Sequence, residues 1–221
     1  MRAIRKKEPL TPERIELTAF EVIEREGLEN FSTRKLAEEL GCQAMSIYHH
    51  FPSKAHLMDA LVDRLIGRMD LAADDLPWRE RFHQVILEWR KLALGSPAFF
   101  RFLALHRLNT AGGLRLLDHM VAIYFDAGLD AETAARLFRT MGYYLTGSLL
   151  DETAGYGKGP SAVEPPSNED IARQYPRIAA VGPYFQANEF EKTFWVGFDI
   201  MAEGMERALA ERAGGPGRKQ S

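Results

Sequence analysis

The chain has 221 residues, of which 46% are hydrophobic and 27% charged, and its 28 basic and 31 acidic residues give a net charge of −3. This composition is typical of a folded globular protein; it excludes disorder over most of the length, and the charge balance excludes a uniformly basic nucleic-acid coat. The single cysteine, Cys42, excludes a disulfide framework and a cysteine-rich zinc site.

No part of the sequence is suited to crossing a membrane. The longest uncharged runs, residues 140–150 and 178–188, are far too short to span a bilayer. Residues 1–8 carry four cations without a following apolar stretch, so we expect a basic flexible arm and not a signal peptide. The sequence therefore predicts a soluble cytoplasmic protein.

The first two expected helices are marked by residues typical of helix ends. Thr11 followed by Pro12 favours a helix start, and Gly27 favours a helix end. Ser32 can cap the second helix, which Gly41 stops. Between these ends, apolar residues recur with helical period: Ile15, Ala19, Val22 and Ile23, then Leu36, Ala37 and Leu40.

Two further helices are expected before a polar boundary at residues 74–77. The third is very short, about residues 43–50, with Ile47 and Phe51 on its inner side. The fourth, which Ser53 can cap, is long and runs from Ser53 to about Ala72. Its apolar stripe consists of Leu57, Leu61, Leu65 and Met69.

The remainder of the sequence also has helical period and contains no convincing strand. We expect helices around residues 82–94, 99–103, 114–127, 130–148 and 190–209, a loop at 155–166 and a disordered tail at 214–221. The predicted fold is all-α. Its domains are a DNA-binding head at residues 9–56 and a larger helical domain at 57–213, which the long fourth helix joins.

The second and third expected helices form a helix-turn-helix, whose second helix enters the major groove of DNA. Ala37 is small where the helices approach, and Gly41 suits the positive φ of the turn. Met45 and His49 lie opposite Ile47 on the outward face. This face has polar groups but no charge, which favours contact with base edges. The open alternative is three packed helices without DNA binding.

The stretch LTPERIELTAFEVIEREGLENFSTRKLAEELGCQAMSIYHHFPSKAHLMDAL resembles the DNA-binding domain of the TetR family of bacterial transcription regulators. The resemblance implies two groups of DNA-binding residues. Those expected to contact phosphates or hold the recognition helix are Thr33, Arg34, Tyr48, His50 and Lys54. Those expected to read bases are Gln43, Ala44, Met45, Ser46 and His49.

A weaker resemblance to the tetracycline-repressor type of regulatory domain lies in LGSPAFFRFLALHRLNT, FDAGLDAETAARLFRTMGYYLTGSLLDE and FWVGFDIMAEGMERAL. It implies a homodimer in which the eighth and last helices form a four-helix interface. The expected interface residues are Leu137, Met141, Leu145, Phe190, Phe194, Phe198 and Met201. The alternative is that these side chains pack within their own chain.

The same resemblance implies a ligand cavity between the bundle helices. In tetracycline repressors a histidine helps chelate a drug-bound Mg²⁺, whereas this sequence has Arg107 at that position and His106 one residue earlier, with Asp151 near the position of the partner carboxylate. We therefore expect no tetracycline binding, no metal and no cofactor, and instead a hydrophobic or aromatic effector. The expected lining residues are Val85, Trp89, Phe102, His106, Thr110, Met141 and Tyr144.

The predicted function is that of a ligand-responsive transcriptional repressor. It would bind a palindromic operator as a homodimer and be released from it by a small-molecule effector. The fourth helix would act as the lever, with Met69 and Asp70 as coupling residues. The alternatives are a helical protein-interaction module without sequence-specific DNA binding and an enzyme. The sequence lacks the common catalytic motifs HExxH, the phosphate-binding Walker loop and the nucleophile elbow.

Overall fold

The computed structural model describes residues 9–71, 73–154 and 162–214, and in these ranges it contains helices and loops but no strand. The prediction of an all-α fold is therefore confirmed. The predicted basic arm, the first part of the predicted loop at 155–166, and residues 215–221 of the predicted tail lie outside the described residues. No helix of the described part is long and apolar enough to cross a membrane.

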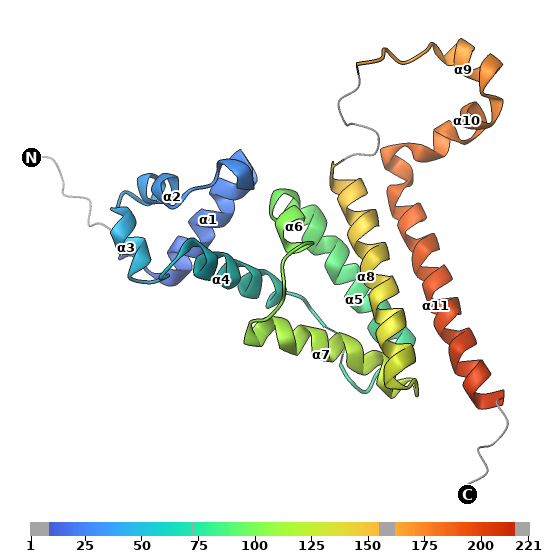
Figure 1. The fold of residues 1–221 in the computed structure, drawn as a ribbon, viewed down its shortest axis with the longest axis horizontal. Helices are drawn as coiled ribbons and strands as arrows, with labels where there is room; N and C mark the ends of the chain where they lie inside the picture. The colour runs from blue at the N-terminus through green and yellow to red at the C-terminus, as the bar shows by residue number, and fades with distance from the viewer. Residues whose placement is uncertain (1–8, 72, 155–161, 215–221) are drawn as a thin grey trace, which may run out of the picture. The chain divides into compact units, whose positions relative to one another are not determined.

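The chain divides into two units that are each continuous in space but not in sequence. The first unit comprises residues 1–70 and 94–119, and the second comprises residues 71–93 and 120–221. Helices α5 (Trp78–Gly95) and α7 (Ala111–Asp126) pass from one unit to the other (Figure 1).

The first unit begins with the four helices that we call the head: α1 (Pro12–Glu26), α2 (Thr33–Leu40), α3 (Ala44–Tyr48) and α4 (Lys54–Ile66). A short 3-10 turn, η1 (Leu28–Asn30), follows α1. Side-chain oxygens of Thr11, Ser32 and Ser53 accept hydrogen bonds from the first turns of α1, α2 and α4, which confirms these three predicted caps.

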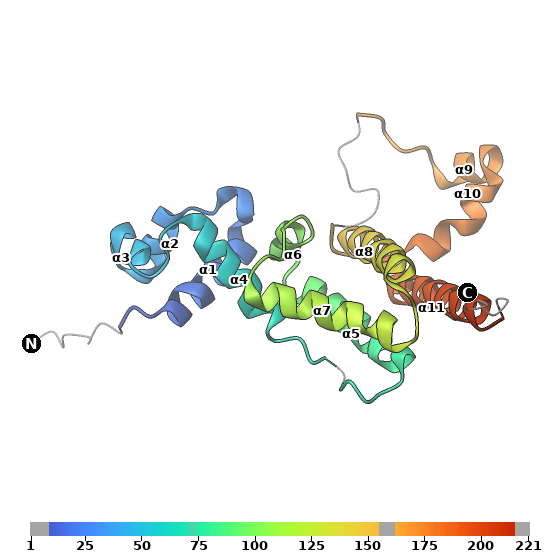
Figure 2. The ribbon, with the colours of Figure 1, turned by 60° about the horizontal axis from the view of Figure 1, so that its bottom comes forward.

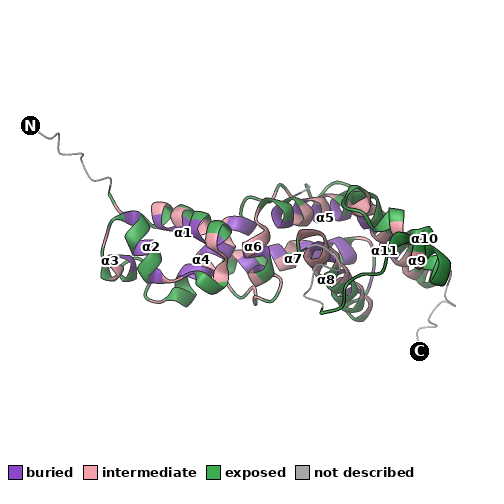
Figure 3. Cartoon of the chain, turned by 90° about the horizontal axis from the view of Figure 1, so that it is seen from above, coloured by how far each residue is buried: buried purple, intermediate pink, exposed green. Residues whose placement is uncertain are grey.

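The core of the head is formed by the apolar stripes that the sequence predicted. Its fully or almost fully buried members include Ile15, Ala19, Ile23, Leu36, Ile47, Leu57 and Leu61. Figure 3 shows these buried positions alternating with exposed ones along α1 and α4. Arg64 adds an ion pair with the nearly buried Glu16, which links α4 to α1.

The predicted end of the fourth helix is wrong. Helix α4 ends at Ile66, and Gly67 and Arg68 form a turn, so Met69 and Asp70 lie beyond the helix. Glycine at position 67 has a low helix propensity, and only polar residues and Met69 follow before Leu71. None of the described residues between Ile66 and Arg81 is buried, so no apolar face continues the stripe of α4.

The rest of the first unit is α6 (Pro97–Leu103) and the beginning of α7. Phe99 on α6 is fully buried and its ring packs edge-on against Phe20 of α1, with 5.0 Å between the ring centroids. Helix α1 of the head therefore packs against α6, which follows it by about 75 residues in the sequence.

The second unit contains most of α5 and the end of α7, together with six further helical elements in its described part. These are α8 (Ala131–Ala154), α9 (Asn168–Gln174), α10 (Pro176–Val181), the 3-10 turns at Gly182–Phe185 and Ala187–Glu189, and α11 (Phe190–Gly214). Helices α8 and α11 pack side by side in both views (Figures 1 and 2). Their contact is reinforced by Tyr144, whose hydroxyl donates to the Phe194 carbonyl oxygen.

Two arginines, the buried Arg81 and the half-buried Arg90, anchor α5 within the second unit. Arg81 is 1% exposed and donates to Asp126 at 2.6 Å and to Asp74 at 3.1 Å. Arg90 makes a bidentate contact with Glu152 of α8, at 2.6 and 3.1 Å. These charge-assisted bonds join α5 to its neighbours with a defined geometry.

Replacing Arg81 by Met should destabilise the protein by about 2 kcal/mol, because the aliphatic part is retained while charge-assisted hydrogen bonds are lost. The measurement is urea unfolding followed by circular dichroism. Arg79→Met is the matched control: Arg79 is half-exposed and pairs with the exposed Glu206, so its loss should cost less than about 1 kcal/mol. Equal costs for the two variants would contradict the anchoring role of Arg81.

Candidate DNA-binding surface and effector site

The turn between α2 and α3 depends on Gly41. Its φ is +65°, in the left-handed region, and its N–H donates to the Glu38 carbonyl at 3.1 Å. The next residue, Cys42, donates its N–H to the Ala37 carbonyl at 3.0 Å. These two bonds close the C-terminus of α2 and redirect the chain into α3, as in a helix-turn-helix.

Helix α3 has only five residues, and its orientation is fixed by burial on one side. Ile47 is 1% exposed and Phe51 is 8% exposed, so both anchor the helix in the head core. On the opposite side Met45 is 63% exposed, and His49 is exposed as well. The structure therefore presents the face that the helical period predicts.

The remaining predicted base-reading residues lie around this face. Gln43 is exposed, whereas Ala44 and Ser46 are half-buried. Tyr48 and His50, which the resemblance places at phosphates or at the support of α3, are exposed at its C-terminal end. We call the surface formed by residues 43–46 and 48–50 the recognition surface; it carries no charged side chain.

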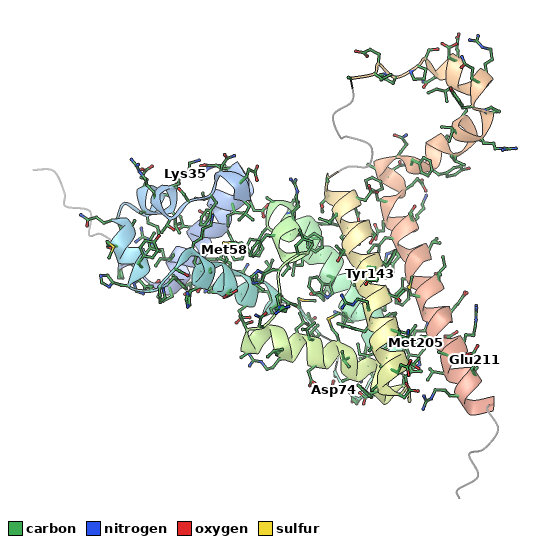
Figure 4. The ribbon with its side chains drawn as sticks, in the orientation of Figure 1. Lys35, Met58, Asp74, Tyr143, Met205 and Glu211 are labelled. Carbon is green, nitrogen blue, oxygen red and sulfur yellow. The ribbon has the colours of Figure 1, made fainter. Side chains whose placement is uncertain are left out.

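The predicted phosphate-contacting residues differ in their exposure and in the contacts that they make within the protein. Arg34 is exposed and pairs at 3.2 Å with Glu38, one turn later on α2. Thr33 is buried, at 9% exposure. Lys54 donates to the Phe31 carbonyl at 2.9 Å and lies 5.1 Å from the centre of that ring, so this side chain also holds the loop before α2 against α4. Figure 4 shows Lys35, next to Arg34, pointing away from the head core.

The predicted effector residues divide between the two units. In the first unit, the His106 ring lies 4.5 Å from the Phe102 ring, and its Nε2 lies 2.9 Å from an Asp59 carboxylate oxygen. Thr110 donates its hydroxyl proton to Asp63. Asp59 and Asp63 are one turn apart on α4, so the segment after α6 is tied to α4 by two polar contacts.

These two aspartates are functional candidates that sequence reasoning missed. The available signal was their spacing of four residues on α4, which matches the spacing of His106 and Thr110. His106 is thus engaged by Asp59, while Arg107, which the resemblance places at the position of the metal-binding histidine, is exposed. In the described residues no cluster of three or more His, Cys, Asp or Glu could hold a metal ion.

A groove of about 730 Å³ lies between the end of α1 and α6 in the first unit. Its wall includes Phe102 and His106 from the predicted effector set, and Glu24 and Leu28 from the head side. Two predicted effector residues therefore face a solvent-open groove next to the head. This volume is in the range of small-molecule sites.

The other predicted effector residues belong to the second unit. Val85 and Met141 are buried in its core. Trp89 is half-buried, and its Nε1 has no hydrogen-bond partner among the described residues. Burial raises the pKa of Tyr144 to about 12, and its hydroxyl donates to the Phe194 carbonyl oxygen.

The predicted dimer-interface residues are used largely within the chain itself. Met141, Leu145, Phe194 and Phe198 are 3–6% exposed and pack in the core of the second unit. Leu137, Phe190 and Met201 are half-buried. The reason is geometric, because a helix in the middle of a bundle has one apolar stripe for its own core and needs a different one for a partner.

The structure shows a second apolar stripe on the same helices, which the sequence analysis did not identify. Tyr143 on α8 is 67% exposed, and Val196 and Ile200 on α11 are 57% and 60% exposed. Tyr143 is labelled on α8 in Figure 4. The signal in the sequence was the four-residue spacing of Val196 and Ile200 beside the core stripe.

Two protein-family models match the chain. The model described as "Bacterial regulatory proteins, tetR family" matches residues 17–61, and the model described as "Tetracyclin repressor-like, C-terminal domain" matches residues 72–209. The second match alone covers more than half of the chain. The end of α4 lies in the gap between the two matches, residues 62–71.

Comparison with individual proteins also finds relatives of this family. The class A tetracycline repressor protein from transposon 1721 of Escherichia coli is 25% identical over 226 residues, covering 94% of this chain and 96% of its own length. A possible TetR family regulator from Streptomyces coelicolor has a TM-score of 0.74 at 24% identity, covering 89% of this chain and 99% of that one. ActR of Streptomyces coelicolor, solved in complex with actinorhodin, has a TM-score of 0.73 at 21% identity, covering 91% and 99% of the two chains. The two structural matches establish the shared fold.

Gly41→Ala should destabilise the head by about 1 kcal/mol, because an L-residue is strained at positive φ. No atom lies within 4 Å of the added Cβ, so steric clash does not contribute. Gly95→Ala is the control: its Cβ would also meet open space, and its backbone lies outside the left-handed region. Urea unfolding of both variants tests this, and a Gly41 variant as stable as the Gly95 variant would refute the role of the turn.

Proposed function

Because the chain belongs to the TetR family of bacterial regulatory proteins, we propose that it represses transcription as a homodimer that binds a palindromic operator and leaves it when a small-molecule effector binds. The protein is a ligand-responsive transcriptional regulator with a helix-turn-helix head and a helical regulatory domain. The observation that carries the proposal is the recognition surface of α3. The proposal places the protein in the bacterial cytoplasm, where it acts on operator DNA.

The recognition surface is suited to reading bases because it offers hydrogen-bonding groups and a thioether but no charge. Gln43, Ser46 and His49 can bond to base edges in the major groove, and Met45 can contact thymine methyl groups. Nonspecific attraction then has to come from outside the surface, from cations such as Arg34. This division separates base readout from phosphate contact.

Homodimerisation is supported by the exposed apolar stripe of Tyr143, Val196 and Ile200. Large apolar side chains left exposed on two helices that pack together are typical of an interface and costly to leave in water. Two heads joined in this way can engage half-sites about 34 Å apart along one face of the duplex. The half-buried Leu137, Phe190 and Met201 would lie at the edge of the same interface.

Effector control is supported by the relatives, among which the tetracycline repressor class A is named for the drug and ActR was solved with actinorhodin. For this chain we expect a hydrophobic or aromatic effector that contacts some of Val85, Trp89, Phe102, His106, Thr110, Met141 and Tyr144. An effector that displaces His106 or Thr110 would break their bonds to Asp59 and Asp63 and thereby shift α4. Such a differential contact is what couples two sites. These aspartates replace Met69 and Asp70 as the expected coupling residues.

Arg34→Ala and His49→Ala should have different effects on DNA binding. Loss of Arg34 should weaken binding to all sequences alike and reduce the slope of log K against log salt by about one. Loss of His49 should change the preference at one base pair by roughly tenfold. Both are measured by fluorescence anisotropy on an operator selected from random DNA and on its single-base variants.

Arg136→Ala is the matched control for Arg34, because Arg136 is also exposed and pairs with a glutamate one turn away on α8. It should leave DNA affinity and the salt dependence unchanged. The assignment of roles is overturned if Arg34→Ala changes base preference or His49→Ala changes only the salt slope. Absence of binding by the wild-type protein to any selected DNA would refute the proposed function itself.

Val196→Glu combined with Ile200→Glu should convert the dimer to a monomer and weaken operator binding by at least about 100-fold, because two charges would be buried at the interface. Sedimentation velocity gives the oligomeric state. Leu114→Glu is the control, since Leu114 is 57% exposed but lies in the first unit. Dimers of the double variant would show that another surface is used.

A further inference from the structure

The first turn of α6 has no cap of its own. Ser96 occupies the N-cap position but makes no side-chain hydrogen bond, and the following residue is Pro97. The N–H groups of Ala98 and Phe99 are then the free donors of the first turn. In most helices a side chain of the preceding residue accepts such bonds.

Glu24 of α1 supplies the missing acceptor. One of its carboxylate oxygens accepts the Phe99 N–H at 3.0 Å, and the other accepts the Ala98 N–H at 3.2 Å. The two bonded residues follow Glu24 by 74 and 75 positions. A carboxylate at this end of a helix also interacts favourably with the helix dipole.

The cap is part of a larger contact between α1 and α6. Phe20, one turn before Glu24, packs its ring against Phe99 of the same turn of α6. Helix α1 also supplies Ile15, Ala19 and Ile23 to the head core, in which Ile47 of α3 is buried. A restraint on α1 therefore restrains the orientation of α3.

From this geometry we propose that Glu24 is a positioning residue for operator binding: by capping α6 it holds the head in one orientation relative to α6. The inference rests on the proposed function. Two heads that bind one duplex must present their recognition surfaces at a fixed spacing. A head that moves freely relative to α6 would lose conformational entropy on binding DNA and would bind more weakly.

The role of Glu24 differs from that of a DNA-contacting residue in a way that can be measured. Loss of a phosphate contact reduces the salt dependence, and loss of a base contact changes sequence preference. Loss of a positioning residue should lower affinity for every sequence and leave both of these properties unchanged.

The test compares Glu24→Ala with Glu21→Ala, since Glu21 is an exposed carboxylate on the same helix. Operator affinity is measured by fluorescence anisotropy over a range of salt concentrations. Glu24→Ala should bind about tenfold more weakly than wild type, with an unchanged salt slope and unchanged base preferences. Glu24→Gln, which keeps one acceptor oxygen, should recover part of the loss, and Glu21→Ala should resemble wild type.

Hydrogen exchange of the free protein reports on the cap without DNA. In Glu24→Ala the amides of Ala98 and Phe99 should exchange about tenfold faster, with no such change in Glu21→Ala. Unchanged exchange at these amides would refute the cap, and wild-type operator affinity of Glu24→Ala or an altered salt slope would refute the positioning role. If wild-type protein binds no DNA, the proposed function and the positioning role both fall, whereas a failure confined to the variants concerns Glu24 alone.

Discussion

Presentation of the recognition surface depends on the burial of Ile47 and Phe51 beneath α3. A helix of five residues is not stable in isolation, because nucleation costs more than its few hydrogen bonds return. Its conformation and orientation must therefore come from the surrounding head. The Gly41 turn fixes where α3 begins, and the buried pair fixes which side faces outward. Met45 and His49 are exposed as a direct result.

The packing of the head also involves residues 94–119, which contain α6 and the beginning of α7. Residues 94–119 belong to the same unit as the head, and three polar contacts join them: Glu24 to the start of α6, Asp59 to His106 and Asp63 to Thr110. Polar contacts of this kind are directional, so they fix an orientation more strictly than apolar packing does. Two of these contacts involve His106 and Thr110, so an effector bound at the proposed site would act on the same bonds that orient the head.

Helices α8 and α11 show how one helix can serve two apolar contacts. Their inner stripe, with Met141 and Phe198, is buried within the second unit, while Tyr143 and Ile200 remain exposed. The helical period of the sequence identified the inner stripe but not the exposed one. Both stripes have helical spacing, and only the burial in the folded chain distinguishes the one that forms the core from the one that is left exposed.

The helical fold, the helix caps at Thr11, Ser32 and Ser53, and the outward face of α3 could all be predicted from the sequence, because they depend on neighbouring residues and on the helical period. The end of α4, the exposed apolar residues of α8 and α11, and the distant partners of Glu24 and Asp59 became known from the folded chain alone. Contacts of this second kind join residues about 50 to 75 positions apart, and no local pattern in the chain specifies which of its many carboxylates will meet a distant helix end or histidine.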